Sequence, residues 1–107
     1  MKKGDIILLP FPFTDLSGNK LRPAIILIST EEDVTVCFLT TQLHLQSKYD
    51  LLINPSPYNG LKKESLIRIN KFATIDKQLI VGRLGSLEER YYSHLNMSLI
   101  KILQLKE

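Results

Sequence analysis

Two polar positions, each beside an apolar run, have side chains that could act on a phosphate. Arg22 stands directly before Pro23 and the apolar run 24–29, and Thr40 follows the apolar run 34–39. Proline disfavours the helical region for the residue before it, so Arg22 should be extended and held firmly where a buried strand begins. A guanidinium can hold two phosphate oxygens and keeps its charge. A threonine hydroxyl can donate a hydrogen bond to the same group or relay a proton. The pattern therefore predicts an anion site if folding brings the two side chains together.

Both residues also fit ordinary structural roles. Arg22 could pair with Asp15 or Glu31, and threonines are common at strand ends, where they make local hydrogen bonds. Because strands joined by a polar turn are usually neighbours, the two apolar runs should lie on one sheet. The strand register decides whether Arg22 and Thr40 meet on that sheet.

Other candidate chemical groups are few. The chain has two histidines, His44 and His94, and neither has metal-ligand spacing. His44 lies in a polar loop and could transfer a proton, whereas His94 falls within a predicted helix. Cys37 is the single cysteine, so no intramolecular disulfide can form, and its apolar neighbours indicate a buried side chain rather than a reactive thiol.

Composition predicts one soluble domain spanning residues 1–107. Apolar residues make up 44% and charged residues 23% of the chain, values typical of globular proteins. The apolar runs are too short to cross a membrane, so we expect a cytoplasmic protein without membrane contact. The net charge of +3 leans toward an anionic partner. The basic residues are scattered, so folding must assemble any anion site.

The elements that would position these residues are short strands followed by one helix. We expect strands at residues 6–11, 24–29, 34–39, 50–53, 64–73 and 80–84, although the alternation in 64–73 is imperfect. Ser86 and Glu89 have the spacing of a capping box, so a helix should start there and run for about five turns with one apolar face on the sheet. These elements predict a mainly β fold, a small half-open β-barrel with a helical appendage.

Several motifs also resemble one bacterial family when taken in order. They are Gly4-Asp5, the loop containing Gly18, Arg22-Pro23, Thr40-Thr41-Gln42, Asn59-Gly60-Leu61 and Thr74-Ile75-Asp76-Lys77. Over residues 4–87 the chain resembles the MazF/PemK-type toxins of type II toxin–antitoxin systems. Each motif alone is a weak signal, whereas the combination is specific.

This resemblance implies an SH3-like barrel with a C-terminal helix, assembled as a homodimer. It implies a sequence-specific endoribonuclease that needs no metal or other cofactor and cuts single-stranded RNA, often messenger RNA. We expect the ribose 2′-OH to attack the adjacent phosphate, which leaves 2′,3′-cyclic phosphate and 5′-OH ends. A co-expressed antitoxin would block the RNA groove, and DNA would be met only through that antitoxin.

The resemblance also assigns the site residues. The family's catalytic arginine and threonine correspond to Arg22 and Thr40, with Thr41 as the register alternative. The other expected RNA contacts come from the residue types of the neighbouring loops: they are Phe13, Lys20, Thr41, Gln42 and His44, and His44 is a candidate on its chemistry alone. Tyr49 and Tyr58 are further stacking candidates.

One departure and two rival functions accompany this hypothesis. Many family members have a Glu- or Gln-containing loop before the Arg-Pro pair, whereas here the loop is LSGNKL and has no carboxylate. A related toxin that inhibits DNA gyrase would need a C-terminal tryptophan, and this chain has none. The other rival is a non-catalytic RNA-binding module of the same fold.

Overall fold

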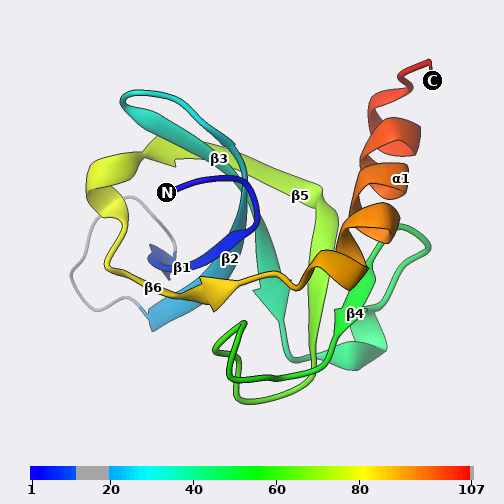
Figure 1. The fold of residues 1–107 in the computed structure, drawn as a ribbon, viewed down its shortest axis with the longest axis horizontal. Helices are drawn as coiled ribbons and strands as arrows, with labels where there is room; N and C mark the ends of the chain where they lie inside the picture. The colour runs from blue at the N-terminus through cyan, green and yellow to red at the C-terminus, as the bar shows by residue number, and fades with distance from the viewer. Residues whose placement is uncertain (12–19, 107) are drawn as a thin grey trace.

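The computed structural model describes residues 1–11 and 20–106, which form one curled antiparallel sheet and a C-terminal helix (Figure 1). The sheet has six strands in the order β4-β5-β3-β2-β1-β6. Their bounds are β1 Asp5–Phe11, β2 Lys20–Ser29, β3 Asp33–Thr40, β4 Leu51–Ile53, β5 Ser65–Asp76 and β6 Gly82–Ser86. The predicted mainly β, half-open barrel with one terminal helix is confirmed.

All six predicted strands are present, with shifted ends. The main difference is β2, which starts four residues before the predicted apolar run because Lys20 to Pro23 pair with β1. Arg22 is therefore extended, as the following proline requires, and lies opposite Leu9. β2 and β3 are neighbours, as expected from the short turn between them.

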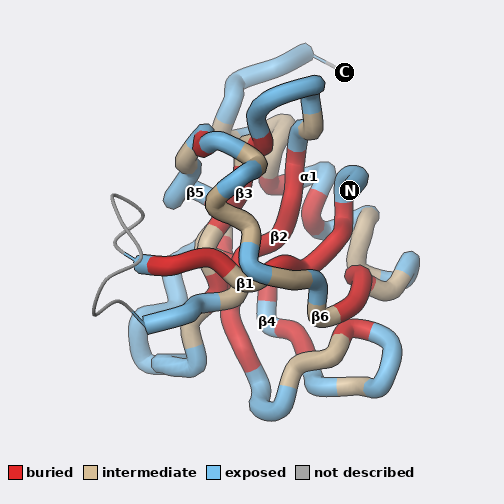
Figure 2. Tube along the Cα trace, turned by 90° about the vertical axis from the view of Figure 1, so that its left-hand side faces the viewer, coloured by how far each residue is buried: buried red, intermediate tan, exposed pale blue. Residues whose placement is uncertain are grey.

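Two apolar clusters form on opposite faces of the sheet because side chains alternate along each strand. In β2, Ile25 belongs to the cluster beneath the helix, and Ala24 and Ile26 belong to the cluster on the other face. Figure 2 shows the buried backbone running through the central strands, with exposed loops around them. We call these clusters the helix-side core and the second core, and the central segment Ala24–Leu27 of β2 is buried between them.

The helix differs from the prediction at both ends. The structure has a 3-10 turn at Glu89–Tyr91 and then α1, Tyr92–Leu103. Gln104 adopts a left-handed conformation with φ 57° and ends α1. The helix is thus 12 residues long, shorter than the predicted five turns. In the described part of the chain, no helix is long and apolar enough to cross a membrane.

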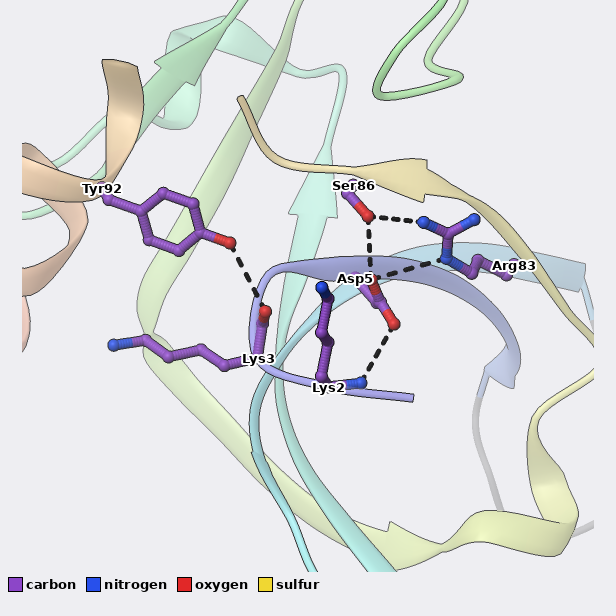
Figure 3. Close-up of polar contacts among 6 residues, drawn as sticks. All are labelled: Lys2, Lys3, Asp5, Arg83, Ser86 and Tyr92. Carbon is purple, nitrogen blue, oxygen red and sulfur yellow. Dashed lines mark hydrogen bonds and ion pairs between the residues drawn. The ribbon is translucent and has the colours of Figure 1, made fainter. Parts of the chain in front are cut away.

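The predicted capping role of Ser86 is wrong. Ser86 is the last residue of β6, opposite Asp5 of β1, and its hydroxyl donates to Asp5 Oδ1 at 2.8 Å. Arg83 Nη2 donates to the same hydroxyl at 2.6 Å, and Arg83 Nε lies 3.4 Å from Asp5 Oδ1 (Figure 3). This cluster, in which Asp5 and Ser86 are buried and Arg83 is half-exposed, ties β6 to β1. A contact across 81 residues thus overrode the local capping signal.

The same cluster controls the ionisation of Asp5. Burial alone would raise the pKa of this carboxyl, but hydrogen bonds from Lys2 N–H and Ser86 and the charge of Arg83 outweigh it. The pKa of Asp5 is therefore lowered below its ordinary value, and the carboxylate is charged at neutral pH.

Candidate active site

The register of the β2–β3 hairpin decides which threonine faces Arg22. Near the turn, Ser29 pairs with Val34, and this register extended along the strands would bring Arg22 opposite Thr41. A β-bulge between Ile26 and Ile28 shifts the pairing by one residue, so that Ala24 pairs with Phe38. Continued by two residues, the shifted register brings Arg22 opposite Thr40. Because side chains alternate, both lie on the face of the second core.

Arg22 and Thr40 line one open cavity of about 370 Å³. The other described lining residues are Phe11, Phe38, Leu39, Leu45, Arg68 and Lys71. The two residues singled out from the sequence therefore share a concave site, which combines cationic groups with an apolar wall.

An irregularity in β5 brings two further cations into this cavity. Cys37 pairs with Phe72, but Leu39 pairs with Ile67, so Phe38 alone stands opposite residues 68–71. The bulge breaks the period of two, and Arg68 and Lys71 line the same cavity although they are three residues apart. It also explains the imperfect alternation noted in this segment of the sequence.

Aromatic rings form the wall beside Arg22. The Arg22 guanidinium carbon lies 5.9 Å from the centroid of the Phe11 ring, within cation–π range. Phe11 in turn contacts Phe38 edge to face, with ring centroids 5.4 Å apart. Within residues 20–106 Arg22 makes no ion pair with Glu31, while the other sequence-based partner, Asp15, lies outside the described residues. Among the described residues the Arg22 charge therefore has no carboxylate partner, and Arg22 lines the cavity.

The Thr40 hydroxyl is oriented by its own loop. The backbone N–H of Gln42 donates to Thr40 Oγ1 at 3.1 Å. A hydroxyl has one proton to donate and can also accept, so this contact leaves the Thr40 proton free for a ligand. The Thr40 hydroxyl is therefore better placed to donate a hydrogen bond to a phosphoryl oxygen than to accept a proton as a base.

The second basic residue of the wall, Arg68, is paired with a buried carboxylate. Arg68 Nε lies 3.0 Å from Asp50 Oδ2, and the Asp50 side chain is fully buried. Asp50 stands one residue before β4, and the β4–β5 register continued by one residue brings it opposite Arg68. Asp50 thereby offsets one of the three cations that line the cavity, which leaves the site positive.

The remaining predicted RNA contacts are not part of the described lining. Thr41 lines a second cavity of about 320 Å³ with Pro23 and the Lys62 side chain. Gln42 and His44 are exposed in and beside the 3-10 turn Leu43–Leu45, of which Leu45 reaches the cavity.

Four other candidates lie away from this cavity or outside the described residues. Lys20 is exposed at the start of β2, opposite Phe11, and Phe13 lies outside the described residues. Of the stacking candidates, Tyr49 lies beneath Lys48, 5.2 Å from its ammonium nitrogen. Tyr58 is exposed and lines a different cavity, beside Ser86 and Tyr92.

Cys37 is inert, as its apolar neighbours indicated. The side chain is fully buried in the helix-side core, and its thiol donates to the Ile69 carbonyl at 3.4 Å. Burial, with a smaller effect of the Asp50 charge, raises the pKa of Cys37 to about 12. The thiolate needed for nucleophilic chemistry is therefore absent near neutral pH.

The family of this chain follows from comparison with known proteins. A family model described as the PemK-like, MazF-like toxin of type II toxin–antitoxin systems matches residues 2–103. The chain is a member of this toxin family. A search of the curated proteins finds no match to this toxin.

Solved structures of toxins share its fold. The Mycobacterium tuberculosis toxin MazF-mt6 aligns with a TM-score of 0.77 at 19% identity, over 96% of this chain and 99% of that chain. An endoribonuclease from a mycobacterial species, in complex with its cognate antitoxin, aligns with a TM-score of 0.73 at 19% identity, over 100% and 96%. The MazE–MazF complex of Deinococcus radiodurans aligns with a TM-score of 0.75 at 13% identity, over 99% and 97%. At these identities the likeness shows the fold of the toxin.

Of the described residues that line the toxin's cavity, sequence reasoning singled out Arg22 and Thr40 and missed the others. Phe11 and Phe38 read as ordinary strand residues, and Arg68 and Lys71 as part of an imperfect alternation. The available signal was the arginine inside the apolar segment 64–73, since a charged side chain there needs a partner or a ligand. Asp50, at the start of another predicted strand, was the partner to look for.

Proposed function

We propose that this toxin is a sequence-specific endoribonuclease that cleaves single-stranded RNA without a metal ion. The observation that carries the proposal is the shared cavity of Arg22 and Thr40, with further cations and an aromatic wall around it. An unpaired RNA strand presents both phosphates and exposed bases, which match such a lining. Membership of the toxin family supports the same reading.

The proposed reaction is attack of the ribose 2′-OH on the adjacent phosphorus. The bond to the 5′ oxygen breaks, and the products end in a 2′,3′-cyclic phosphate and a 5′-OH. Arg22 would stabilise the charge that grows on the phosphoryl oxygens, and a preorganised donor of this kind contributes roughly 3–4 kcal/mol. Thr40 would donate a hydrogen bond to the same phosphate and keep its proton, while the 2′-OH loses a proton to a base and the departing 5′ oxygen takes one up to become the 5′-OH. DNA lacks the attacking hydroxyl, so it should not be cut.

Removal of the 2′-OH proton needs another group. Imidazole is the side chain that changes charge near neutral pH. His44 is adjacent in sequence to Leu45 of the cavity wall, although it is not itself among the lining residues. His44 therefore stays a candidate base, to be tested by the pH profile of His44→Ala.

Two partners belong to the proposal. The solved relatives include complexes with an antitoxin, which supports a cognate antitoxin that covers the RNA site of this chain. We also propose a cytoplasmic homodimer, with any DNA contact made through the antitoxin alone.

The test is cleavage of a mixed-sequence single-stranded RNA in excess EDTA. We expect cyclic phosphate ends from the wild type and a loss of about 10²–10³-fold in rate for Arg22→Ala. Arg90→Ala is the matched control, because Arg90 lies over the Tyr91 ring and is not among the residues that line the cavity. Binding without cutting would instead identify a non-catalytic RNA-binding module.

A further inference from the structure

The pair formed by Arg68 and Asp50 holds one edge of a guanidinium and leaves the other open. Asp50 Oδ2 lies 3.0 Å from Arg68 Nε and also accepts the backbone N–H of Ser47 at 3.0 Å. The Arg68 N–H is not directed at the carboxylate, so the contact is an ion pair and not a hydrogen bond. Among the described residues, Asp50 Oδ1 has no hydrogen-bond partner. The charge of Arg68 is thus the main compensation for a fully buried carboxylate.

The terminal nitrogens of Arg68 have no such partner. Within residues 1–11 and 20–106 they make no hydrogen bond, and the side chain, 19% exposed, lines the cavity of Arg22 and Thr40. A guanidinium has five N–H donors in a planar fork, so an arginine whose Nε side is ion-paired with a carboxylate can still bind an anion through its far edge. The β5 bulge fixes the backbone from which this side chain reaches the cavity.

A second arginine–aspartate pair in the same chain shows the contrasting arrangement. Arg83 Nε lies 3.4 Å from Asp5 Oδ1, but its Nη2 donates to Ser86, so the fork is used within the protein (Figure 3). Arg83 is also not among the residues that line the Arg22 cavity. Both arginines therefore neutralise a buried aspartate, but only Arg68 also lines the cavity where a ligand could bind.

We propose that Arg68 binds an RNA phosphate next to the one that Arg22 holds, and that Asp50 is its positioning residue. This inference rests on the proposed function for the identity of the ligand. The alternative explanation is that Arg68 only neutralises Asp50. The two explanations differ in whether Arg68 contacts an RNA phosphate. For a single strand, each neutralised phosphate steepens the slope of log K against log salt concentration by about 0.7.

The experiment measures that salt dependence with a 2′-O-methylated RNA oligonucleotide of mixed sequence, which cannot be cleaved. Fluorescence anisotropy gives the Kd between 50 and 200 mM salt for the wild type, Arg68→Gln and Arg83→Gln. We expect Arg68→Gln to lower the slope by about 0.7, so that the loss of affinity over this range is roughly 2.6-fold smaller than in the wild type. Arg83→Gln, which also deprives a buried aspartate of its arginine, should keep the wild-type slope.

A second variant guards against misfolding. Arg68→Gln alone leaves the Asp50 charge buried and unpaired, which is strongly destabilising. The double variant Asp50→Asn with Arg68→Gln removes both charges, and its slope should fall by the same amount. A wild-type slope in the folded double variant would overturn the inference. Failure of the wild type to bind the oligonucleotide at any salt would overturn the proposed function as well, so the two failures are distinguishable.

The role of Asp50 has its own readout. Asp50→Asn keeps the Arg68 charge, so the salt slope should stay at the wild-type value. We expect KM for RNA cleavage to rise several-fold with kcat within about twofold, because the guanidinium is no longer held in place. A lowered melting temperature with unchanged KM would mean that Asp50 stabilises the fold and does not position Arg68.

Discussion

At the scale of single residues, substitutions of Thr40 can test the role of its hydroxyl separately from that of its side-chain volume. Thr40→Val keeps the volume and removes the hydroxyl, whereas Thr40→Ser keeps the hydroxyl. Hydrogen bonds to charged groups contribute about 1.5–3 kcal/mol, so we expect Thr40→Val to slow RNA cleavage roughly 10–150-fold. Thr40→Ser should stay within a few-fold of the wild type. The measurement is the single-turnover cleavage rate with saturating protein.

The neighbouring threonine tests the register that the β-bulge creates. Thr41 lines the cavity beside Pro23, not the one beside Arg22. Thr41→Val should therefore slow cleavage much less than Thr40→Val does. A larger loss of rate for Thr41→Val than for Thr40→Val would mean that the reacting phosphate binds beside Thr41 and not beside Thr40.

At the scale of elements, the loop before β5 is held by one buried side chain, Asn59. Its Oδ1 accepts the backbone N–H groups of Ser56 and Leu61, and its Nδ2 donates to the Asn54 carbonyl and to Glu88 Oε1. The next residue, Gly60, has φ 73°, and a Cβ there would run into the Leu84 carbonyl. The Asn59-Gly60 pair is therefore explained by the structure of this loop, in which Asn59 supplies the hydrogen bonds and Gly60 the positive φ.

We predict that Asn59→Ala lowers the free energy of unfolding by about 3 kcal/mol, because it leaves buried N–H and C=O groups without partners. Urea unfolding monitored by circular dichroism measures the change. Asn96→Ala is the control, since Asn96 is exposed on α1 and accepts only the Lys3 ammonium; it should change stability by less than about 0.5 kcal/mol. Equal effects of the two substitutions would contradict the assigned role of Asn59.

The β1–β6 closure predicts a specific acid sensitivity. The folded pKa of Asp5 lies below the ordinary value of an aspartate carboxyl, so its charged form stabilises the native state above about pH 4. That contribution is lost as the pH falls through the folded pKa. The gap in unfolding free energy between wild type and Asp5→Asn should therefore be constant from pH 5 to 7 and shrink below about pH 4. A gap that persists unchanged at pH 2–3 would rule out ionisation of Asp5 as its source.

At the scale of the whole molecule, the proposed homodimer can be tested directly. The monomer mass is 12.3 kDa. Several large apolar side chains are exposed near the cavity end of β1 and β2, including Phe11 at 44% and Leu21 at 49%. We expect sedimentation equilibrium at micromolar concentration to give about twice the monomer mass, since such side chains favour association. A single 12.3 kDa species across that range would contradict the dimer.

The sequence alone determined the presence of the strands, the buried middle of β2 and the extended Arg22. Continuous apolar runs bounded by proline and polar turns require buried strands, and Pro23 restricts the residue before it. It also determined that Cys37 would be buried, since both of its neighbours in β3 are apolar. These features depend on residues close together in the chain, which is why local rules suffice.

Only the tertiary structure decided which groups meet. The bulge between Ile26 and Ile28 selects Thr40 over Thr41, and the bulge opposite Phe38 brings Arg68 and Lys71 to the same cavity. Ser86 became a partner of Asp5 instead of a helix cap. In each case the outcome depends on pairing between distant strands, where a shift of one residue changes the face of every side chain that follows. No local propensity encodes that shift, so the strand pairing and not the motif fixed the composition of the site.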